Sequence, residues 1–380
     1  MFKLLLFDIN YTNGVNRSPL IIKIKHWQKA NIKITIFTNL EGVNYYNLKF
    51  KDVSFITVPF RYNIKSPYSL LLEYIRVTII ALPRFLKTKG QFDILYSLAT
   101  LDFLFLPWVL RNIDRKIRWF AMVDNVVPQP GKRPGNFTLN TISYIAFLIG
   151  NLLLKRTDGI FVVTDLLKKY YEKKGVKVIK TGNGYGVDHK IFRGEVHPNT
   201  PIFNALYCGR IHIAKGVFDL VEVFKNVVLK DKKFTLGIMG DGDENTKARL
   251  IGKIKEYHLE NNIFLIGYKE GYEKGNIYQS CGVFIFLSYD ENCPQTVLEA
   301  FAANKQVIAY NLPVYHDVFK KYINTGELAL FNKGDVKAIS DYIVKGKFKE
   351  SIYLNDPADF SWEKITKKEI KAFYKSNIRE

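Results

Sequence analysis

Two carboxylates, Glu291 and Glu299, flank a sharp change in the pattern of the sequence. Residues 283–287 are a short, continuous apolar run, which predicts a strand covered on both faces. A polar loop follows, and Pro294 suits the first position of a helix because its missing N–H group is not needed there. Apolar residues then recur at helical spacing until residues 306–310 resume a strand. The stretch therefore predicts a strand, a loop, a helix and a second strand.

This arrangement suits a ligand that carries a diphosphate. A helix N-terminus attracts phosphate through its free N–H groups and its dipole. At a rise of about 1.5 Å per residue, Glu299 would lie roughly 7 Å along the helix axis from Pro294. A nucleotide sugar on the helix start could then present sugar hydroxyls to Glu291 and ribose hydroxyls to Glu299. The alternative is that Glu291 caps the helix and that Glu299 is a solvated surface acid.

A second predicted loop carries two cations between glycines. Residues 203–207 predict a strand, which Gly209, Arg210, Lys215 and Gly216 follow. Glycine lets the backbone approach a ligand, and an arginine with a lysine can neutralise a diphosphate leaving group. The alternative is a pair of solvated bases, and the flanking glycines argue against it.

A third loop, residues 240–243, follows the apolar run 234–239. Gly240 and Gly242 favour a turn that approaches a phosphate or a nucleoside. The segment Asp241-Gly242-Asp243 is expected to turn the chain and cap the helix that follows, so we expect no required metal.

The segment Glu291-x7-Glu299, with Pro294 and the tripeptide 298–300, resembles the signature of the retaining GT-B glycosyltransferases of family 4. The other two loops agree with that family in order and spacing, and residues 180–188 are similar to its Asn-Gly-Val-Asp segment. The likeness covers most of the chain and is strongest over residues 205–310.

The chain departs from the family at two places. It has Asn292-Cys293 where the family usually has Gly-Phe, which leaves the identity of the sugar open. It has Asn304 where the family usually has glycine, and asparagine tolerates the left-handed conformation expected there.

The resemblance implies roles for individual residues. Glu291, Arg210 and Lys215 are the expected catalytic residues: Glu291 would orient the sugar, and the two cations would stabilise the departing diphosphate. Glu299 would bind the ribose, and Tyr268 would stack on the base or pack internally. The expected donor-binding set is Gly209, Gly240, Gly242, Tyr268, Asn292, Cys293, Pro294 and Glu299.

Two further roles are assigned to the first half of the chain. The resembled family uses the first loop to hold the acceptor, which points to Asn13, Gly14 and Arg17, although an ordinary strand–helix loop is the alternative. That family often places a histidine near residue 124 to touch the donor sugar, and this chain has none between residues 26 and 189. Asp124 is the candidate replacement, and a turn-capping aspartate is the alternative.

The resemblance also implies the architecture: an α/β GT-B fold of two facing Rossmann-like domains with a cleft between them. We expect an N-terminal acceptor domain over residues 1–195 and a nucleotide-sugar domain over residues 196–360. The C-terminal helix, residues 361–380, should pack back on the first domain. At 380 residues, two domains are also the natural expectation from length alone.

The composition indicates the kind of partner and the redox compartment of the protein. The formal net charge of +20 at pH 7 favours an anionic partner such as nucleic acid, an acidic lipid surface or phosphorylated substrates. No zinc spacing, RNP-like motif or concentrated basic tract points to nucleic acid. The three cysteines have no metal-ligand spacing, which indicates a reducing compartment.

Membrane contact is expected at the surface of a bilayer rather than across it. Residues 142–154 are apolar but fall short of the roughly 20 residues that a span needs. Residues 60–68 mix aromatic and basic side chains, which suits either an interfacial contact or a solvated loop. No signal peptide is expected, since residues 1–3 lead directly into a strand. A cytoplasmic protein, peripheral at the inner face of the membrane, is the resulting hypothesis.

The predicted function is metal-independent and needs no cofactor: transfer of a hexose from a nucleotide-diphosphate sugar, such as a GDP- or UDP-hexose, to a glycan or lipid-linked acceptor. Retention of anomeric configuration is implied by the resemblance. The alternatives are a GT-B nucleotide-sugar epimerase and a non-enzymatic basic protein that binds anionic lipid or nucleic acid.

Overall fold

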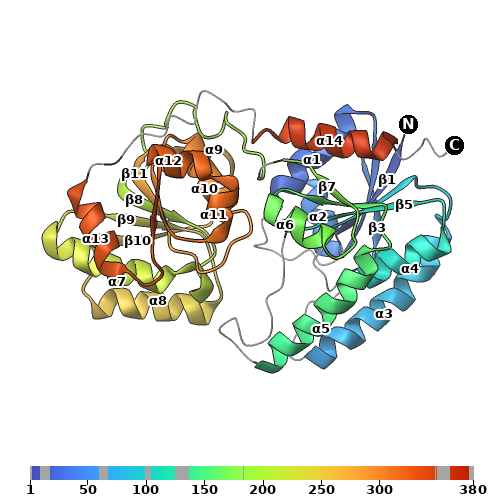
Figure 1. Cartoon of the computed structure of the whole chain (residues 1–380), viewed down its shortest axis with the longest axis horizontal. Coiled ribbons are helices and arrows are strands. Elements are labelled where there is room, and N and C mark those ends of the chain that lie inside the picture. Colours follow the sequence, from blue (N-terminus) through green and yellow to red (C-terminus); the bar gives the residue numbers. More distant parts are fainter. Residues whose placement is uncertain are drawn as a thin grey trace. The chain divides into compact units, whose positions relative to one another are not determined.

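The computed structural model describes residues 2–8, 18–59, 67–98, 104–124, 137–182, 184–346, 348 and 360–375. These residues form two compact units, one of residues 1–183 with 362–380 and one of residues 184–361 (Figure 1). The expected boundary near residue 195 lies a short way after this division. Among the described residues, no helix is both long enough and apolar enough to cross a membrane.

The described part of the first unit contains a 7-stranded sheet with the order β3-β2-β1-β4-β5-β6-β7. Every pairing between neighbours is parallel. Its strands are β1 (Lys3–Asp8), β2 (Lys33–Thr38), β3 (Val53–Thr57), β4 (Ile94–Leu98), β5 (Arg118–Met122), β6 (Gly159–Val162) and β7 (Val178–Lys180). Its helices are α1 (Ser18–Lys29), α2 (Leu40–Asn47), α3 (Pro67–Leu86), α4 (Phe105–Ile113), α5 (Phe137–Leu154), α6 (Asp165–Glu172) and α14 (Trp362–Lys375).

The second unit repeats this topology in a 6-stranded parallel sheet with the order β10-β9-β8-β11-β12-β13. Its strands are β8 (Phe203–Cys208), β9 (Leu236–Met239), β10 (Ile263–Gly267), β11 (Cys281–Phe286), β12 (Val307–Tyr310) and β13 (Leu328–Phe331). Its helices are the 3₁₀ turn η2 (Ile213–Lys215), α7 (Val217–Lys230), α8 (Glu244–Glu256), α9 (Gly271–Gln279), α10 (Gln295–Ala302), α11 (Pro313–Val318), α12 (Lys320–Thr325) and α13 (Val336–Lys345).

The central strands of both sheets are buried on their two faces, as their apolar runs predict. Residues 283–286 of β11 are all at most 3% exposed, and helices cover the sheet on either side (Figure 1). Parallel strands need this double cover because each crossover connection lays a helix on the sheet. The strand predicted from this apolar run is confirmed.

In each unit the strand order reverses between two central strands, β1 and β4 in the first and β8 and β11 in the second. The loops that follow those strands leave the sheet toward opposite faces. In open α/β sheets, ligands bind at this point, beyond the carboxyl ends of the strands. The topology therefore predicts a ligand site at the loops after β8 and β11.

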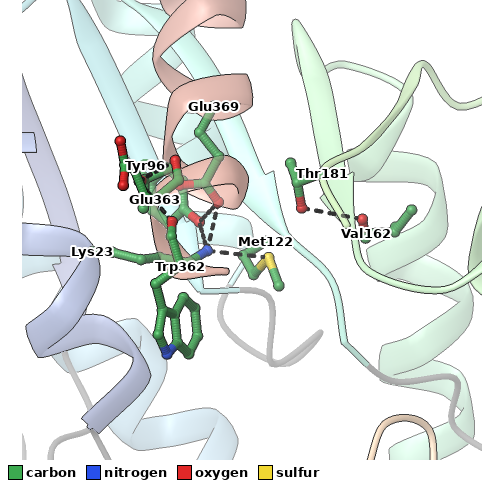
Figure 2. A network of polar contacts seen from close by, with 9 residues as sticks. Lys23, Tyr96, Met122, Val162, Thr181, Trp362, Glu363 and Glu369 are labelled. Atoms are coloured by element: carbon green, nitrogen blue, oxygen red, sulfur yellow. Dashed lines mark hydrogen bonds and ion pairs between the residues drawn. The ribbon is translucent and has the colours of Figure 1, made fainter. Parts of the chain in front are cut away.

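A buried ion pair fixes the last helix to the first unit. Helix α14 lies beside α1 (Figure 1), and Lys23 Nζ is 2.5 Å from Glu369 Oε1, with side chains 4% and 0% exposed. Lys23 Nζ also lies 3.0 Å from the hydroxyl of Tyr96 and 3.6 Å from the sulfur of Met122 (Figure 2). A chain segment more than three hundred residues from α1 is thereby built into the core of the first unit.

Lys23→Met should destabilise the first unit. Removing the cation leaves the buried Glu369 carboxylate without its ion-pair partner, which costs about 3–5 kcal/mol. Tryptophan fluorescence during urea unfolding reports on this unit alone, because all 4 tryptophans belong to it: Trp27, Trp108, Trp119 and Trp362.

Two controls make this test specific. Lys168→Met breaks a pair of the first unit whose side chains are 41% and 48% exposed, and it should cost less than about 1 kcal/mol. The double variant Lys23→Met/Glu369→Met replaces the buried pair with apolar side chains and should recover most of the loss. An unchanged urea midpoint for Lys23→Met would contradict this account of how α14 is held.

Candidate active site

The predicted donor-binding residues gather at one edge of the second sheet. Gly209 follows β8, Gly240 follows β9, Tyr268 follows β10 and Glu291 follows β11. These four strands are consecutive in the sheet order and parallel, so their carboxyl ends meet at the same edge. The site is therefore built from four neighbouring loops of a single unit.

The loops after β8 and β9 run backbone against backbone. Gly209 N donates to the Met239 carbonyl at 3.0 Å, and Ile211 N donates to the Asp241 carbonyl at 2.8 Å. At Gly240, φ is 143°, and a Cβ atom there would lie 1.9 Å from the Gly209 carbonyl oxygen. The close contact between these loops by itself requires glycine at position 240, without any bound ligand. The donor-binding role of Gly240 stays a prediction.

The loop after β11 is docked on the loop after β8. Tyr289 N donates to the Ala214 carbonyl at 3.0 Å, and the Ser288 hydroxyl reaches the same oxygen at 3.3 Å. Gly216 has φ 70°, and a Cβ atom there would lie 1.9 Å from the Leu287 carbonyl oxygen. The absence of a side chain at Gly216 thus permits the close approach that brings the two loops together.

This docking brings the predicted lysine to the predicted glutamate. Lys215 Nζ and a carboxylate oxygen of Glu291 form an ion pair, with side chains 17% and 10% exposed. Arg210 is exposed and pairs with no carboxylate among the described residues. The alternative that Lys215 is a solvated base is therefore wrong. The two predicted cations differ, since Lys215 is paired with Glu291 whereas Arg210 is exposed to solvent.

Two tyrosines hold the loop that carries Glu291. The hydroxyls of Tyr289 and Tyr310 each lie 2.5 Å from Asp219 Oδ2, in the first turn of α7. Burial, with the hydrogen bond to Asp219, raises the pKa of Tyr289 to about 12, so this hydroxyl remains a donor at neutral pH. The position of Glu291 thus depends on an anchor that the sequence did not reveal.

Glu299 is buried rather than solvated, which overturns the alternative assigned to it. Its side chain is 6% exposed, and Lys274 Nζ lies 2.7 Å from Oε1 and 2.6 Å from Oε2. The Tyr278 hydroxyl donates to Oε2 at 3.1 Å. The sequence analysis did not identify Lys274. The sequence offered one indication, because Lys274 and Tyr278 lie one helical turn apart on α9.

The helix that carries Glu299 begins one residue later than expected. Pro294 is the N-cap residue, and α10 starts at Gln295 without a side-chain hydrogen bond to the cap. Glu291 therefore does not cap this helix, and the backbone N–H groups of its first turn have no capping side chain. Helix α10 ends at Ala302, and Asn304, two residues later, has φ 61°, which confirms the predicted left-handed residue.

Among the remaining residues of the donor loops, the structure confirms one prediction and leaves others untested. Asp243 caps α8 by accepting from Thr246 N at 2.9 Å, as predicted. Tyr268 is 50% exposed, so a fully packed side chain is ruled out while base stacking stays a prediction. Cys293 lies buried just before the helix and belongs to no disulfide. Among the residues that the structure describes, no group of three or more acidic, histidine or cysteine side chains could hold a metal.

The predicted acceptor residues lie on the first unit. Asn13, Gly14 and Arg17 fall outside the described residues. Asp124 is exposed and follows β5 at the carboxyl end of the first sheet. It occupies the edge at which a ligand is expected, and its role stays a prediction.

Gly240→Ala should disrupt the second unit, because the new methyl group would meet the Gly209 carbonyl and φ is 143° there. We expect a loss of more than about 2 kcal/mol, seen as a lower melting temperature by circular dichroism. The control is Gly252→Ala on α8, where a Cβ atom meets nothing within 4 Å and a gain of up to about 1 kcal/mol is expected. Equal melting temperatures for both variants would show that the two loops do not depend on this contact.

Comparison with known proteins relates part of the second unit to a known family. Residues 189–347 match the family model described as glycosyl transferases group 1. Over 102 residues the chain is 36% identical to an uncharacterized glycosyltransferase of Methanocaldococcus jannaschii, covering 27% of this chain and 24% of that protein. The chain spans about a quarter of the length of the curated relatives it matches first.

Two solved structures share the architecture over nearly the whole chain. A sucrose-phosphate synthase from Thermosynechococcus elongatus superposes with a TM-score of 0.74 at 16% identity, covering 100% of both chains. The Anabaena protein HepE, solved with UDP and glucose, superposes with a TM-score of 0.73 at 14% identity, covering 98% of this chain and 99% of that one. The predicted GT-B fold of two Rossmann-like units is confirmed. These similarities show the GT-B fold and a match of residues 189–347 to the glycosyl transferases group 1 model.

Proposed function

We propose that this protein transfers a hexose from a nucleotide-diphosphate sugar to a glycan or lipid-linked acceptor, with retention of anomeric configuration and without a metal ion. The observation that carries the proposal is the ion pair between Lys215 and Glu291, formed by the loop that also carries Arg210 and the loop that leads into the uncapped start of α10. These groups lie on the loops after β8 and β11, where the strand order reverses.

The chemistry of these groups suits a diphosphate leaving group. Breaking the bond between sugar and diphosphate builds negative charge on the phosphate oxygens. Arg210 can bind such oxygens in a bidentate manner, and the N–H groups at the start of α10 add donors. The site can thus neutralise the charge with its own cations and donors, which is why we propose a reaction without a metal.

The ion pair between Lys215 and Glu291 is consistent with a donor site in its ligand-free state. An arriving diphosphate would compete with the Glu291 carboxylate for Lys215, since both are anions within reach of the same ammonium group. Glu291, released from Lys215, would accept hydrogen bonds from hydroxyls of the sugar. One exchange of partners would therefore place a cation on the phosphate and a carboxylate on the sugar.

The acceptor is proposed to bind the first unit. Asn13, Gly14 and Arg17, on the loop after β1, would hold it, and Asp124, after β5, would face the donor sugar.

The donor is tested by measuring nucleotide release from UDP-, GDP- and ADP-sugars without acceptor or added metal. We expect slow release from one of them. Arg210→Ala should reduce it by about a hundredfold or more, because a donor to the developing charge is lost. Glu291→Ala should also abolish the release, since the sugar is no longer oriented.

The control is Lys255→Ala, which removes an exposed cation of α8 far from these loops in sequence and should leave the rate unchanged. A sugar whose configuration changes without acceptor would indicate an epimerase instead. If none of the donors is hydrolysed and none binds in a direct assay, the transferase proposal is wrong.

A surface of the first unit supports a peripheral position at the inner face of the membrane. Four side chains spaced along α5 are exposed: Ile145 by 51%, Leu148 by 44%, Ile149 by 51% and Leu152 by 63%. Their spacing places them on one face of the helix. Lys155 and Arg156 follow directly, in a chain of net charge +20. We propose that this face enters the interface of an anionic bilayer, with the cations at the headgroups.

Leu152→Asp should weaken sedimentation with vesicles that contain anionic phospholipid, because a charge would be buried at the interface. Leu229→Asp is the matched control, since Leu229 on α7 is 76% exposed outside the proposed surface. Wild-type binding by both variants, or no binding by the wild type, would contradict the membrane proposal without affecting the donor site.

A further inference from the structure

The ion pair formed by Lys274 and Glu299 is the most enclosed charged contact near the donor loops. Lys274 lies on α9 with a side chain 14% exposed, and its ammonium group contacts both carboxylate oxygens of Glu299. Tyr278, one helical turn along α9, donates to Oε2 of the same carboxylate. Two side chains of α9 therefore fix one carboxylate of α10.

We infer that Lys274 is a positioning residue for the nucleoside: it holds the Glu299 carboxylate ready to accept a single ribose hydroxyl. This inference rests on the proposed function, in which Glu299 binds the ribose. It adds Lys274, which lies outside the motif around Glu299, and it limits Glu299 to one ribose hydroxyl.

Counting acceptor positions supports a single hydroxyl. A carboxylate offers about four lone-pair positions. Lys274 approaches both oxygens and Tyr278 approaches Oε2, so three approaches are already made from α9. About one position then remains for a ligand. A carboxylate without these partners could accept from both ribose hydroxyls at once.

Burial explains why a cation is needed here. A carboxylate that is 6% exposed costs much free energy unless it is paired. The other titratable groups that face it, Cys208 at the end of β8, Tyr278 on α9 and Tyr268 after β10, carry no positive charge. Burial raises the pKa of Cys208 and of both tyrosines, so all three are neutral near pH 7. Lys274 is thus the cation that keeps Glu299 in place.

An alternative is that Lys274 itself touches the nucleotide. The two cases differ in how the effects of mutations combine. If Lys274 acts through Glu299, the loss of both groups should be no worse than the loss of Glu299 alone. If Lys274 binds the nucleotide directly, the two losses should add.

The experiment is calorimetric titration with UDP, 2′-deoxy-UDP and 3′-deoxy-UDP. The wild type should lose affinity for one deoxy analogue by about tenfold to a hundredfold and should tolerate the other, because a hydrogen bond to a charged group is lost once. Lys274→Met and Glu299→Gln should both abolish this discrimination. Lys274→Arg keeps a cation and should restore part of it.

The double variant Lys274→Met/Glu299→Gln leaves no unpaired buried charge, so it keeps the test valid if Lys274→Met alone folds poorly. It should bind UDP as Glu299→Gln does. Full discrimination by Lys274→Met would overturn the inference, as would additive losses in the double variant or equal losses for both deoxy analogues in the wild type.

The nucleoside is chosen by the wild type. If GDP or ADP binds more tightly than UDP, its deoxy analogues replace those of UDP. Failure of all three to bind would overturn the proposed function and this inference together. Binding without the predicted discrimination would overturn this inference alone.

Discussion

The close approach of two loops at the strand-order reversal of the second sheet is the constraint on which the site depends. Gly216 lies against the Leu287 carbonyl, and Tyr289 N donates to the Ala214 carbonyl. Only then can Lys215 and Glu291, which are 76 residues apart in sequence, form their ion pair. A largely buried ion pair adds little net stability, because the desolvation cost offsets the attraction. Its value in this account is chemical: it keeps a cation and a carboxylate adjacent until a donor separates them.

The two units divide the work of the proposed reaction. The second unit holds the described donor residues, and its fixed points are backbone contacts, the Asp219 anchor and the Lys274–Glu299 pair. The first unit holds the predicted acceptor residues, and its last helix is fixed by the buried pair of Lys23 and Glu369. In both units, buried ion pairs join elements that are distant in sequence. Such contacts specify which helix packs where, at some cost in desolvation.

The strand, loop and helix pattern near Glu291 was predictable from sequence, because apolar runs, glycine and proline act locally. The positions of Arg210, Lys215 and Glu299 on loops and helices followed from the same local signals. Their partners did not, since pairing of Lys215 with Glu291 or of Glu299 with Lys274 depends on how β8, β9, β10 and β11 order themselves in the sheet. Gly240 illustrates the limit: its glycine suggested a ligand, whereas the structure shows a neighbouring backbone at that place.

The central claim is that a nucleoside diphosphate binds at the start of α10, between the loops after β8 and β11. A crystal structure with whichever of UDP, GDP and ADP binds most tightly tests it most directly. We expect phosphate oxygens in contact with Arg210, Lys215 and the first turn of α10, with Lys215 separated from Glu291 and a ribose hydroxyl on Glu299. A nucleotide bound elsewhere, or one that leaves the pair of Lys215 and Glu291 intact while its phosphates face solvent, would contradict it.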